Sequence, residues 1–354
     1  MTRLLEILIS LAIVAALFLI VGIVLPSSRH LEHSVETNRK MSIVFDTLNS
    51  LRRFKDWNPL VLRDPAVKLS LSGPEAGVGA RLDYESQERG IGTGSWTLVE
   101  SEKNKRIAYD LETVEPGRNK RMEFLLEPTG RNNRNVQITQ TFDIDYGWNL
   151  LGRYAGMYVS SNVGEDIKMG LTRLSNMLAT VPNYDYNELA KADAAAAPKL
   201  ADRGAENVLV VTAAVERNNE KVQSTMNNNM QWINKVMAAN GLEAAGPVRI
   251  VTNEFGSQTY SFDVVQPVRK AGATGKLDIK LEGPVTANYT EPTKIAVTRF
   301  KGHMANLNRI RDALRGWAMT RGYETTERPY ENWIGGLDKG FTEEGEFEVV
   351  WAVK

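Results

Sequence analysis

Cysteine is absent from this sequence of 354 residues, which excludes disulfide bonds, thiolate nucleophiles and cysteine-ligated metal centres. Histidine occurs only at His30, His33 and His303, without the spacing of a zinc motif, so we expect no metal site. Acidic and basic residues number 43 each, so no overall charge favours a nucleic-acid partner. The sequence also has no P-loop, no Rossmann glycine fingerprint and no Gly-x-Ser-x-Gly elbow, and we expect no cofactor.

The remaining composition is that of a globular protein. Hydrophobic residues make up 42% of the chain and charged residues 24%, which is enough apolar material for sizeable cores. The length suggests two domains with additional segments.

The longest apolar stretch is residues 4–25, which contain 22 residues and one charge, Glu6. At about 1.5 Å per helical residue, this length crosses a hydrocarbon core of about 30 Å. The sequence Pro26-Ser27-Ser28-Arg29 that follows is a poor cleavage site, so we expect an uncleaved single-pass anchor in the lipid bilayer of a bacterial inner membrane. The flanking positive charges are nearly balanced and leave the side of the soluble domains open.

Residues 31–180 have the pattern of an α+β domain. A strand at 31–36 and a helix at 41–51 come first. Strands separated by turn residues are then predicted at 68–71, 81–84, 94–100, 106–111, 121–127 and 136–146. One face of the last strand holds Val136, Ile138, Phe142, Ile144 and Tyr146. A closing helix has a buried stripe at Val163, Ile167, Leu171, Leu174 and Leu178.

This order resembles the START-like, or polyketide cyclase/dehydrase (SRPBCC), family. The resemblance is carried by the first strand, the corner Phe54-Lys55-Asp56-Trp57-Asn58-Pro59, the strand entry Gly92-Thr93-Gly94-Ser95-Trp96 and the final helix. It implies a START/Bet v 1-like helix-grip fold, in which a curved sheet wraps around the last helix and leaves a cavity for hydrophobic ligands. Candidates to line the cavity are Tyr84, Trp96, Phe124 and Phe142, with plain core packing as the alternative role. We select Trp96 and Phe142 as ligand-binding residues.

Residues 181–204 contain Pro182, Pro198 and a run of four alanines without apolar periodicity, which predicts an interdomain linker. The segment that follows, residues 205–354, contains one β-α-β-β pattern twice. The first copy has strands at 207–214, 248–252 and 258–265, and its helix has a stripe at Val222, Met226, Met230, Ile233 and Met237 that ends near Asn240-Gly241.

The second copy has strands at 294–300, 323–333 and 347–353, with a helix stripe at Leu307, Ile310, Leu314 and Trp317. A hairpin-like insert at 276–288 separates the copies. One copy cannot bury both its sheet and its helix surfaces. We therefore expect the two copies to form one sheet backed by two helices, with a cleft between them.

The duplicated pattern resembles the gyrase-inhibitor-like (GyrI-like) effector-binding domain, which follows the DNA-binding part of many multidrug-responsive bacterial regulators. The second copy carries the resemblance in Val297-Thr298-Arg299-Phe300-Lys301-Gly302-His303, Gly322-Tyr323, Tyr330-Glu331-Asn332-Trp333 and Val349-Val350-Trp351-Ala352-Val353. The resemblance implies that Glu331 lies at the cleft floor and pairs with cationic aromatic ligands. The family often has Gly-Pro-Tyr where this chain has Gly302-His303-Met304, which departs from the pattern at that contact.

The residues around Glu331 suit a hydrophobic or cationic small molecule, because aromatic faces attract cations and a desolvated carboxylate neutralises them. Trp333 and Tyr330 are the aromatic ligand-binding candidates of the second copy. Adjacent strand residues point to opposite faces, so Trp333, which shares the face of Glu331, is the better partner and Tyr330 the weaker one. From the first copy we add Tyr260 and Phe262, which share one face of their strand. A rim carboxylate paired with lysine or arginine is the alternative role of Glu331.

We therefore expect a membrane-anchored binding or sensing protein with two ligand-binding domains, no catalytic residue and no DNA-binding segment. One alternative is a hydrolase or cyclase that acts on a small hydrophobic substrate with Glu331 as general base. Another is an envelope scaffold that binds no ligand.

Overall fold

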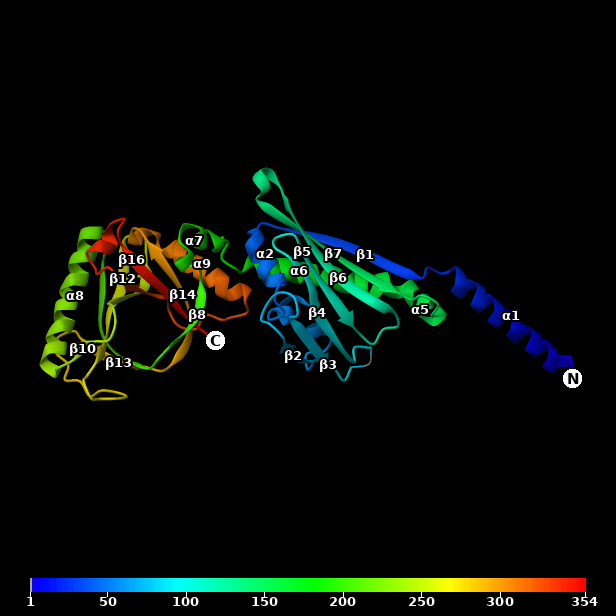
Figure 1. Ribbon diagram of the computed structural model, residues 1–354, viewed down its shortest axis with the longest axis horizontal. Helices are drawn as coiled ribbons and strands as arrows, with labels where there is room; N and C mark the ends of the chain where they lie inside the picture. Colours follow the sequence, from blue (N-terminus) through cyan, green and yellow to red (C-terminus); the bar gives the residue numbers. More distant parts are fainter. Residues whose placement is uncertain (1, 89) are drawn as a thin grey trace. The chain divides into compact units, whose positions relative to one another are not determined.

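The computed structural model describes residues 2–88 and 90–354, and the chain divides between Val181 and Pro182 into two compact units (Figure 1). Both units are α+β, as the sequence predicts. Each has an antiparallel sheet of its own and is described separately below.

The first unit begins with helix α1 (Thr2–Val24) and strand β1 (Ser28–Thr37), followed by α2 (Met41–Leu48), α3 (Phe54–Trp57) and α4 (Leu60–Arg63). Its remaining strands are β2 (Lys68–Ser72), β3 (Arg81–Glu85), β4 (Thr93–Glu102), β5 (Arg106–Glu112), β6 (Arg118–Thr129) and β7 (Asn135–Asp145). Three helical segments close it, α5 (Leu150–Ala155), the short η2 (Gly156–Tyr158) and α6 (Val159–Ala179). The sheet order is β1-β7-β6-β5-β4-β3-β2, which places the first strand beside the last.

The helix α6 is held against this sheet, as the helix-grip prediction requires. It contacts β1, β7 and α3. The predicted stripe is buried at Ile167, Leu171, Leu174 and Leu178. Trp57 of α3 belongs to a cluster of edge-to-face aromatic rings. Its ring centroid lies 5.6 Å from that of Phe54, 6.3 Å from that of Trp96 and 5.8 Å from that of Phe124.

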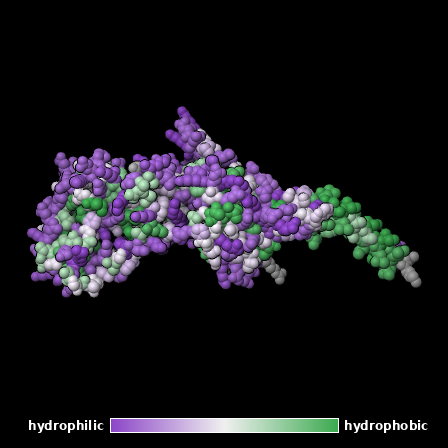
Figure 2. Space-filling model, in the orientation of Figure 1, coloured by the Kyte–Doolittle hydropathy of each residue, from purple (hydrophilic) through white to green (hydrophobic). Residues whose placement is uncertain are grey.

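The helix α1 is almost entirely exposed, and most of its surface visible in Figure 2 is apolar. Within the described residues it is the one helix long and apolar enough to cross a membrane, with a mean hydropathy of 3.2 over its most apolar window.

The second unit contains helices α7 (Asn187–Ala192), α8 (Asn219–Asn240) and α9 (Leu307–Thr320). Its strands are β8 (Lys199–Arg203), β9 (Glu206–Glu216), β10 (Glu243–Ala244), β11 (Arg249–Phe255), β12 (Thr259–Arg269), β13 (Thr286–Thr290), β14 (Thr293–Lys301), β15 (Tyr330–Trp333) and β16 (Glu346–Val353). The sheet order is β13-β9-β12-β11-β15-β16-β14-β8, so the two predicted copies meet at the β11–β15 pair. Helix α8 contacts β9 and β12, and α9 contacts β14 and β16, so the copies pack in the same way.

The sequence places two segments of this unit incorrectly. Part of the predicted linker, residues 181–204, forms α7 and strand β8, which pairs with β14 from Lys199 opposite Val297 to Arg203 opposite Thr293. This short edge strand has two adjacent apolar residues, Leu200 and Ala201, between charged ones, so it lacks the alternation that marks a strand. The predicted hairpin insert, residues 276–288, contains no hairpin; only its end, from Thr286, belongs to a strand, β13, which pairs with β9.

Substitution of Leu174 by alanine tests the position of α6. Leu174 is fully buried, so we expect Leu174→Ala to lower the free energy of unfolding of the first unit by about 2–5 kcal/mol. Met169→Ala on the exposed side of the same helix is the matched control, with an expected change within about 0.5 kcal/mol. Calorimetric unfolding measures both variants, and equal losses would contradict the observed packing of α6.

Candidate functional site

A cavity of about 120 Å³ lies between the sheet of the first unit and α6. The predicted residues Trp96 and Phe142 both line it, and so does Tyr84. Phe124 is buried behind Trp57 instead. The rest of the wall comes from the α3–α4 corner, the sheet, α6 and the nearby loops, at Trp57, Asn58, Pro59, Leu60, Arg63, Gly90, Ile91, Leu111, Thr113, Glu115, Met122, Gln140, Val163, Asp166, Ile167 and Gly170.

Two polar atoms in this wall lack a hydrogen-bond partner among the described residues. They are Nε1 of Trp57 and Oε1 of Gln140, and each side chain belongs to a residue that is only 3% exposed. The other amide atom of Gln140, Nε2, lies 2.7 Å from Sδ of Met122. A buried polar group without a partner costs free energy, so such groups mark places where a ligand can supply the missing bond.

The rim of the cavity carries an ion pair between Arg63 and Asp166, at 2.7 Å. Burial raises the pKa of Asp166 above its ordinary value, although the attraction of Arg63 opposes the shift. Burial also raises the pKa of Tyr84 to about 12, so its phenol is neutral at physiological pH and can donate a hydrogen bond.

The second unit holds Glu331 in a pocket of only about 30 Å³. Glu331 is fully buried in β15, where it pairs with Ile250 of β11 and Val349 of β16. Both of its oxygens accept hydrogen bonds from Arg311 of α9, with Nε 2.5 Å from Oε1 and Nη2 2.7 Å from Oε2. The carboxylate predicted to meet a cationic ligand therefore already has a cation from its own chain.

Arg311 and Glu331 form a buried ion pair, in which each charge compensates the other. Burial alone would lower the pKa of Arg311, but attraction by Glu331 and the two hydrogen bonds raise it above its ordinary value. A carboxylate held in this way neither binds an external cation nor accepts a proton from a substrate unless Arg311 moves. This contact weighs against Glu331 as a general base.

The other predicted residues of this domain separate into two groups. Tyr260 and Trp333 line the Glu331 pocket, and the Tyr260 hydroxyl lies 3.1 Å from Oγ1 of Thr252. Phe262 is buried beside Tyr260, with ring centroids 4.8 Å apart, but does not line the pocket. Tyr330 lies on the opposite face of the sheet, where Arg249 stacks over its ring at 4.7 Å.

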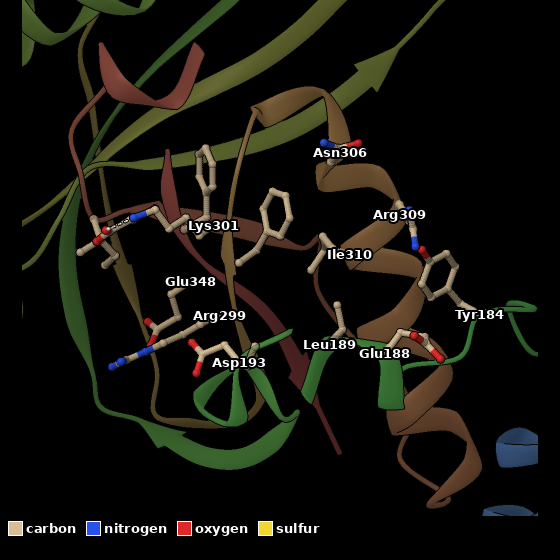
Figure 3. Close-up of a pocket in the computed structure, with 15 residues that line it drawn as sticks. Tyr184, Glu188, Leu189, Asp193, Arg299, Lys301, Asn306, Arg309, Ile310 and Glu348 are labelled. Carbon is tan, nitrogen blue, oxygen red and sulfur yellow. Dashed lines mark ion pairs between the residues drawn. The ribbon is translucent and has the colours of Figure 1, made fainter. Parts of the chain in front are cut away.

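A larger cleft of about 660 Å³ lies on the other side of α9, between α9, α7 and the ends of β14 and β16 (Figure 3). Its apolar surface comes from Leu189, Phe300, Ile310 and Phe347, with the two phenylalanine rings stacked at 6.0 Å. Charges of both signs surround it, at Glu188, Asp193, Arg299, Lys301, Arg309, Glu346 and Glu348. Arg309 stacks over Tyr184 at 4.8 Å, and Lys301 pairs with Glu346 at 3.6 Å.

No group of three or more histidine, aspartate or glutamate side chains in the described part of the chain could hold a metal ion.

Two of the important residues were missed by the sequence reasoning, although each leaves a signal. Gln140 occupies the position at which the apolar alternation of β7 skips a residue, between Ile138 and Phe142. Arg311 follows Leu307 by four positions and precedes Leu314 by three, so it lies on the buried stripe of its helix. A charged residue at such a position requires a buried partner, and Glu331 is that partner.

Removal of the Arg311 side chain tests the pairing. Arg311→Ala leaves Glu331 buried without a cation, and we expect a loss of about 3–5 kcal/mol in the free energy of unfolding. Millimolar ethylguanidinium should restore part of the loss by binding in the vacated space. Exposed Arg315 on the same helix gives the control Arg315→Ala, which should show neither effect in calorimetry. Loss without rescue would show that the space does not accept a free guanidinium.

Solved structures are similar to parts of this chain at low sequence identity. The C-terminal domain of EcmrR is similar with a TM-score of 0.36 and 19% identity, over 44% of this chain and 96% of that chain. Norcoclaurine synthase from Thalictrum flavum has a TM-score of 0.34 and 12% identity, over 43% and 94%. An NMR structure from Thermobifida fusca has a TM-score of 0.34 and 19% identity, over 42% and 93%. A search of curated proteins finds no match. Residues 28–178 match the family described as polyketide cyclase/dehydrase and lipid transport, which confirms the resemblance inferred for the first domain.

Proposed function

We propose that this protein binds a small hydrophobic molecule carrying a hydroxyl group in the helix-grip cavity of its first domain, and that α1 anchors it in a membrane. The observation that carries the ligand assignment is the pair of buried, unpartnered groups in the cavity wall, Trp57 Nε1 and Gln140 Oε1. The first is a hydrogen-bond donor and the second an acceptor. A hydroxyl group can donate and accept, so it can supply the bond that either group lacks.

The size of the cavity restricts the apolar part of the ligand. A protein cavity of about 150 Å³ accommodates benzene, and the volume here is about 120 Å³. The enclosed space therefore suits one aromatic ring or an aliphatic group of similar size. A longer molecule would extend past the Arg63–Asp166 pair at the rim, where Arg63 is half exposed.

The anchoring proposal rests on the length, the hydropathy and the exposure of α1. Its 23 residues extend about 34 Å at 1.5 Å per residue, which exceeds the thickness of a bilayer core by a few ångströms. The bacterial inner membrane remains our proposed location, with either orientation of the soluble domains.

A pair of matched compounds tests the cavity assignment. We expect p-cresol to bind the soluble part of the chain, residues 26–354, about tenfold more tightly than toluene, because only p-cresol supplies the missing hydrogen bonds. Isothermal titration calorimetry measures both affinities. Equal affinities would refute the role of Trp57 and Gln140, and no binding of either compound would refute the cavity as a site.

The location of the site is tested by filling it. Val163 lines the cavity from α6, so Val163→Phe should lower the affinity for p-cresol at least about tenfold by occupying the ring site. Met169→Phe adds a ring on the exposed face of the same helix and should leave the affinity unchanged. If the two variants bind alike, the compound sits elsewhere.

We propose as a second function that the second domain binds a larger amphipathic molecule, as expected of a gyrase-inhibitor-like effector-binding domain. The repeated β-α-β-β order and the position of Glu331 support that family assignment. The available space favours the 660 Å³ cleft at Phe300 and Phe347 over the pocket at Glu331. Its apolar floor and its charged rim suit a ligand with an apolar body and a charged end.

The cleft proposal is tested with the amphipathic anion 8-anilinonaphthalene-1-sulfonate. Phe300→Ala should reduce its affinity about tenfold, because the ring forms part of the apolar floor. Leu281→Ala, at an exposed position of the same unit outside the cleft, is the control. Fluorescence titration separates the two, and an unchanged affinity in Phe300→Ala would remove the cleft as the site.

A further inference from the structure

A run of large apolar side chains is exposed on the segment that follows β7. The solvent-exposed fraction is 81% for Trp148, 71% for Leu151, 53% for Met157 and 63% for Tyr158. Residues 148–158 include α5 and η2 and contain a single charged residue, Arg153. Single exposed apolar residues are ordinary on a protein surface, but such a run marks an interaction site.

The same segment is fastened to the end of α1. Nη1 of Arg153 donates hydrogen bonds to the carbonyl oxygens of Ile23, at 2.8 Å, and Leu25, at 3.1 Å. The Tyr154 hydroxyl donates to the carbonyl oxygen of Phe18 at 2.7 Å, and the two rings stack with centroids 4.4 Å apart. Gly22 permits this approach, since a Cβ there would lie 3.2 Å from the Tyr154 ring.

These contacts fix the position of residues 148–158 along the axis of α1. Phe18 precedes the last helical residue, Val24, by six positions, which is about 9 Å along the helix axis. With α1 across a bilayer, Tyr154 then lies near the boundary between headgroups and acyl chains. Tyrosine and tryptophan favour this level, because their rings are apolar and their polar tips reach water. The guanidinium of Arg153 donates its hydrogen bonds to backbone carbonyl oxygens, so its N–H groups keep their partners when the segment is inserted.

We propose that residues 148–158 form a second membrane contact, in which Trp148, Leu151, Met157 and Tyr158 insert into the interfacial layer of the bilayer next to α1. This inference rests on the proposed anchoring by α1 and adds a peripheral surface to it. The occupant of the apolar surface is lipid, because the surface continues directly from the helix that enters the membrane. Insertion fixes the distance and the tilt of the first domain relative to the bilayer.

The contact also brings one wall of the cavity close to the lipid. Tyr146 packs against Gly152 and Gly156 of the segment, and it also lies against Gly117 of the β5–β6 loop. That loop lines the cavity through Thr113 and Glu115. A hydrophobic ligand dissolved in the membrane would therefore meet the cavity near the surface of the bilayer.

The absence of cysteine permits a direct test in the full chain. A nitroxide is attached to single cysteines introduced as Leu151→Cys, Tyr158→Cys, Val78→Cys and Leu11→Cys. The proteins are placed in vesicles of phosphatidylcholine with a minor fraction of phosphatidylglycerol, and collision with oxygen and with a water-soluble nickel chelate is measured. Val78 is 60% exposed in the loop before β3 and is the matched control.

We expect the labels at 151 and 158 to collide with oxygen and to be protected from the nickel chelate about fivefold or more relative to the label at 78. Nickel accessibility equal to that of the label at 78 would overturn the inference. If the label at 11 still reports lipid in that case, anchoring by α1 stands alone. If the label at 11 reports water, anchoring fails as well. Shielding of 151 and 158 from both reagents, with spin–spin broadening, would identify a second copy of the chain as the occupant and also overturn the proposal.

Discussion

The pairing of β1 with β7 is the contact on which the first domain depends. It runs from Ser28 opposite Asp145 to Thr37 opposite Val136 and joins segments that are far apart in the sequence. The pairing places the first strand in the sequence beside the last strand of the same sheet, and α6 contacts both strands. Because α1 ends shortly before β1 and α5 begins shortly after β7, the same register places α5 beside the end of the apolar helix. The cavity and the exposed apolar surface of residues 148–158 are thus consequences of one strand pair.

The sequence predicts elements well where burial is periodic. The strands of the first domain and the stripe of α6 follow from alternation and from helical spacing, because each has one face in the core. The duplicated order of the second domain follows for the same reason. Strand β8 could not be predicted, since an edge strand buries little and carries no pattern. In α8, Val236 is buried rather than the predicted Met237, which is a small rotation of the stripe.

The candidate sites were predicted less completely than the fold, and the reason is physical. Four predicted residues line the two pockets, because large rings on buried faces border the space between the sheet and its helix. They are Trp96, Phe142, Tyr260 and Trp333. Gln140 and Arg311 interrupt the apolar pattern, and their meaning depends on which partner the fold brings to them. Fold alone decides that Arg311 meets Glu331 and that Oε1 of Gln140 meets no partner among the described residues.

The buried pair of Arg311 and Glu331 has a further consequence, because the guanidinium is tethered to the site that it occupies. A group held on a helix beside its acceptor acts as a ligand with an effective concentration on the order of millimolar or higher. A free cation must compete with this concentration before it can bind to the carboxylate. A free cation therefore displaces Arg311 only when its concentration and its affinity for the carboxylate together outweigh the effective concentration of the tethered guanidinium. Dilute or weakly binding cations leave the ion pair unchanged.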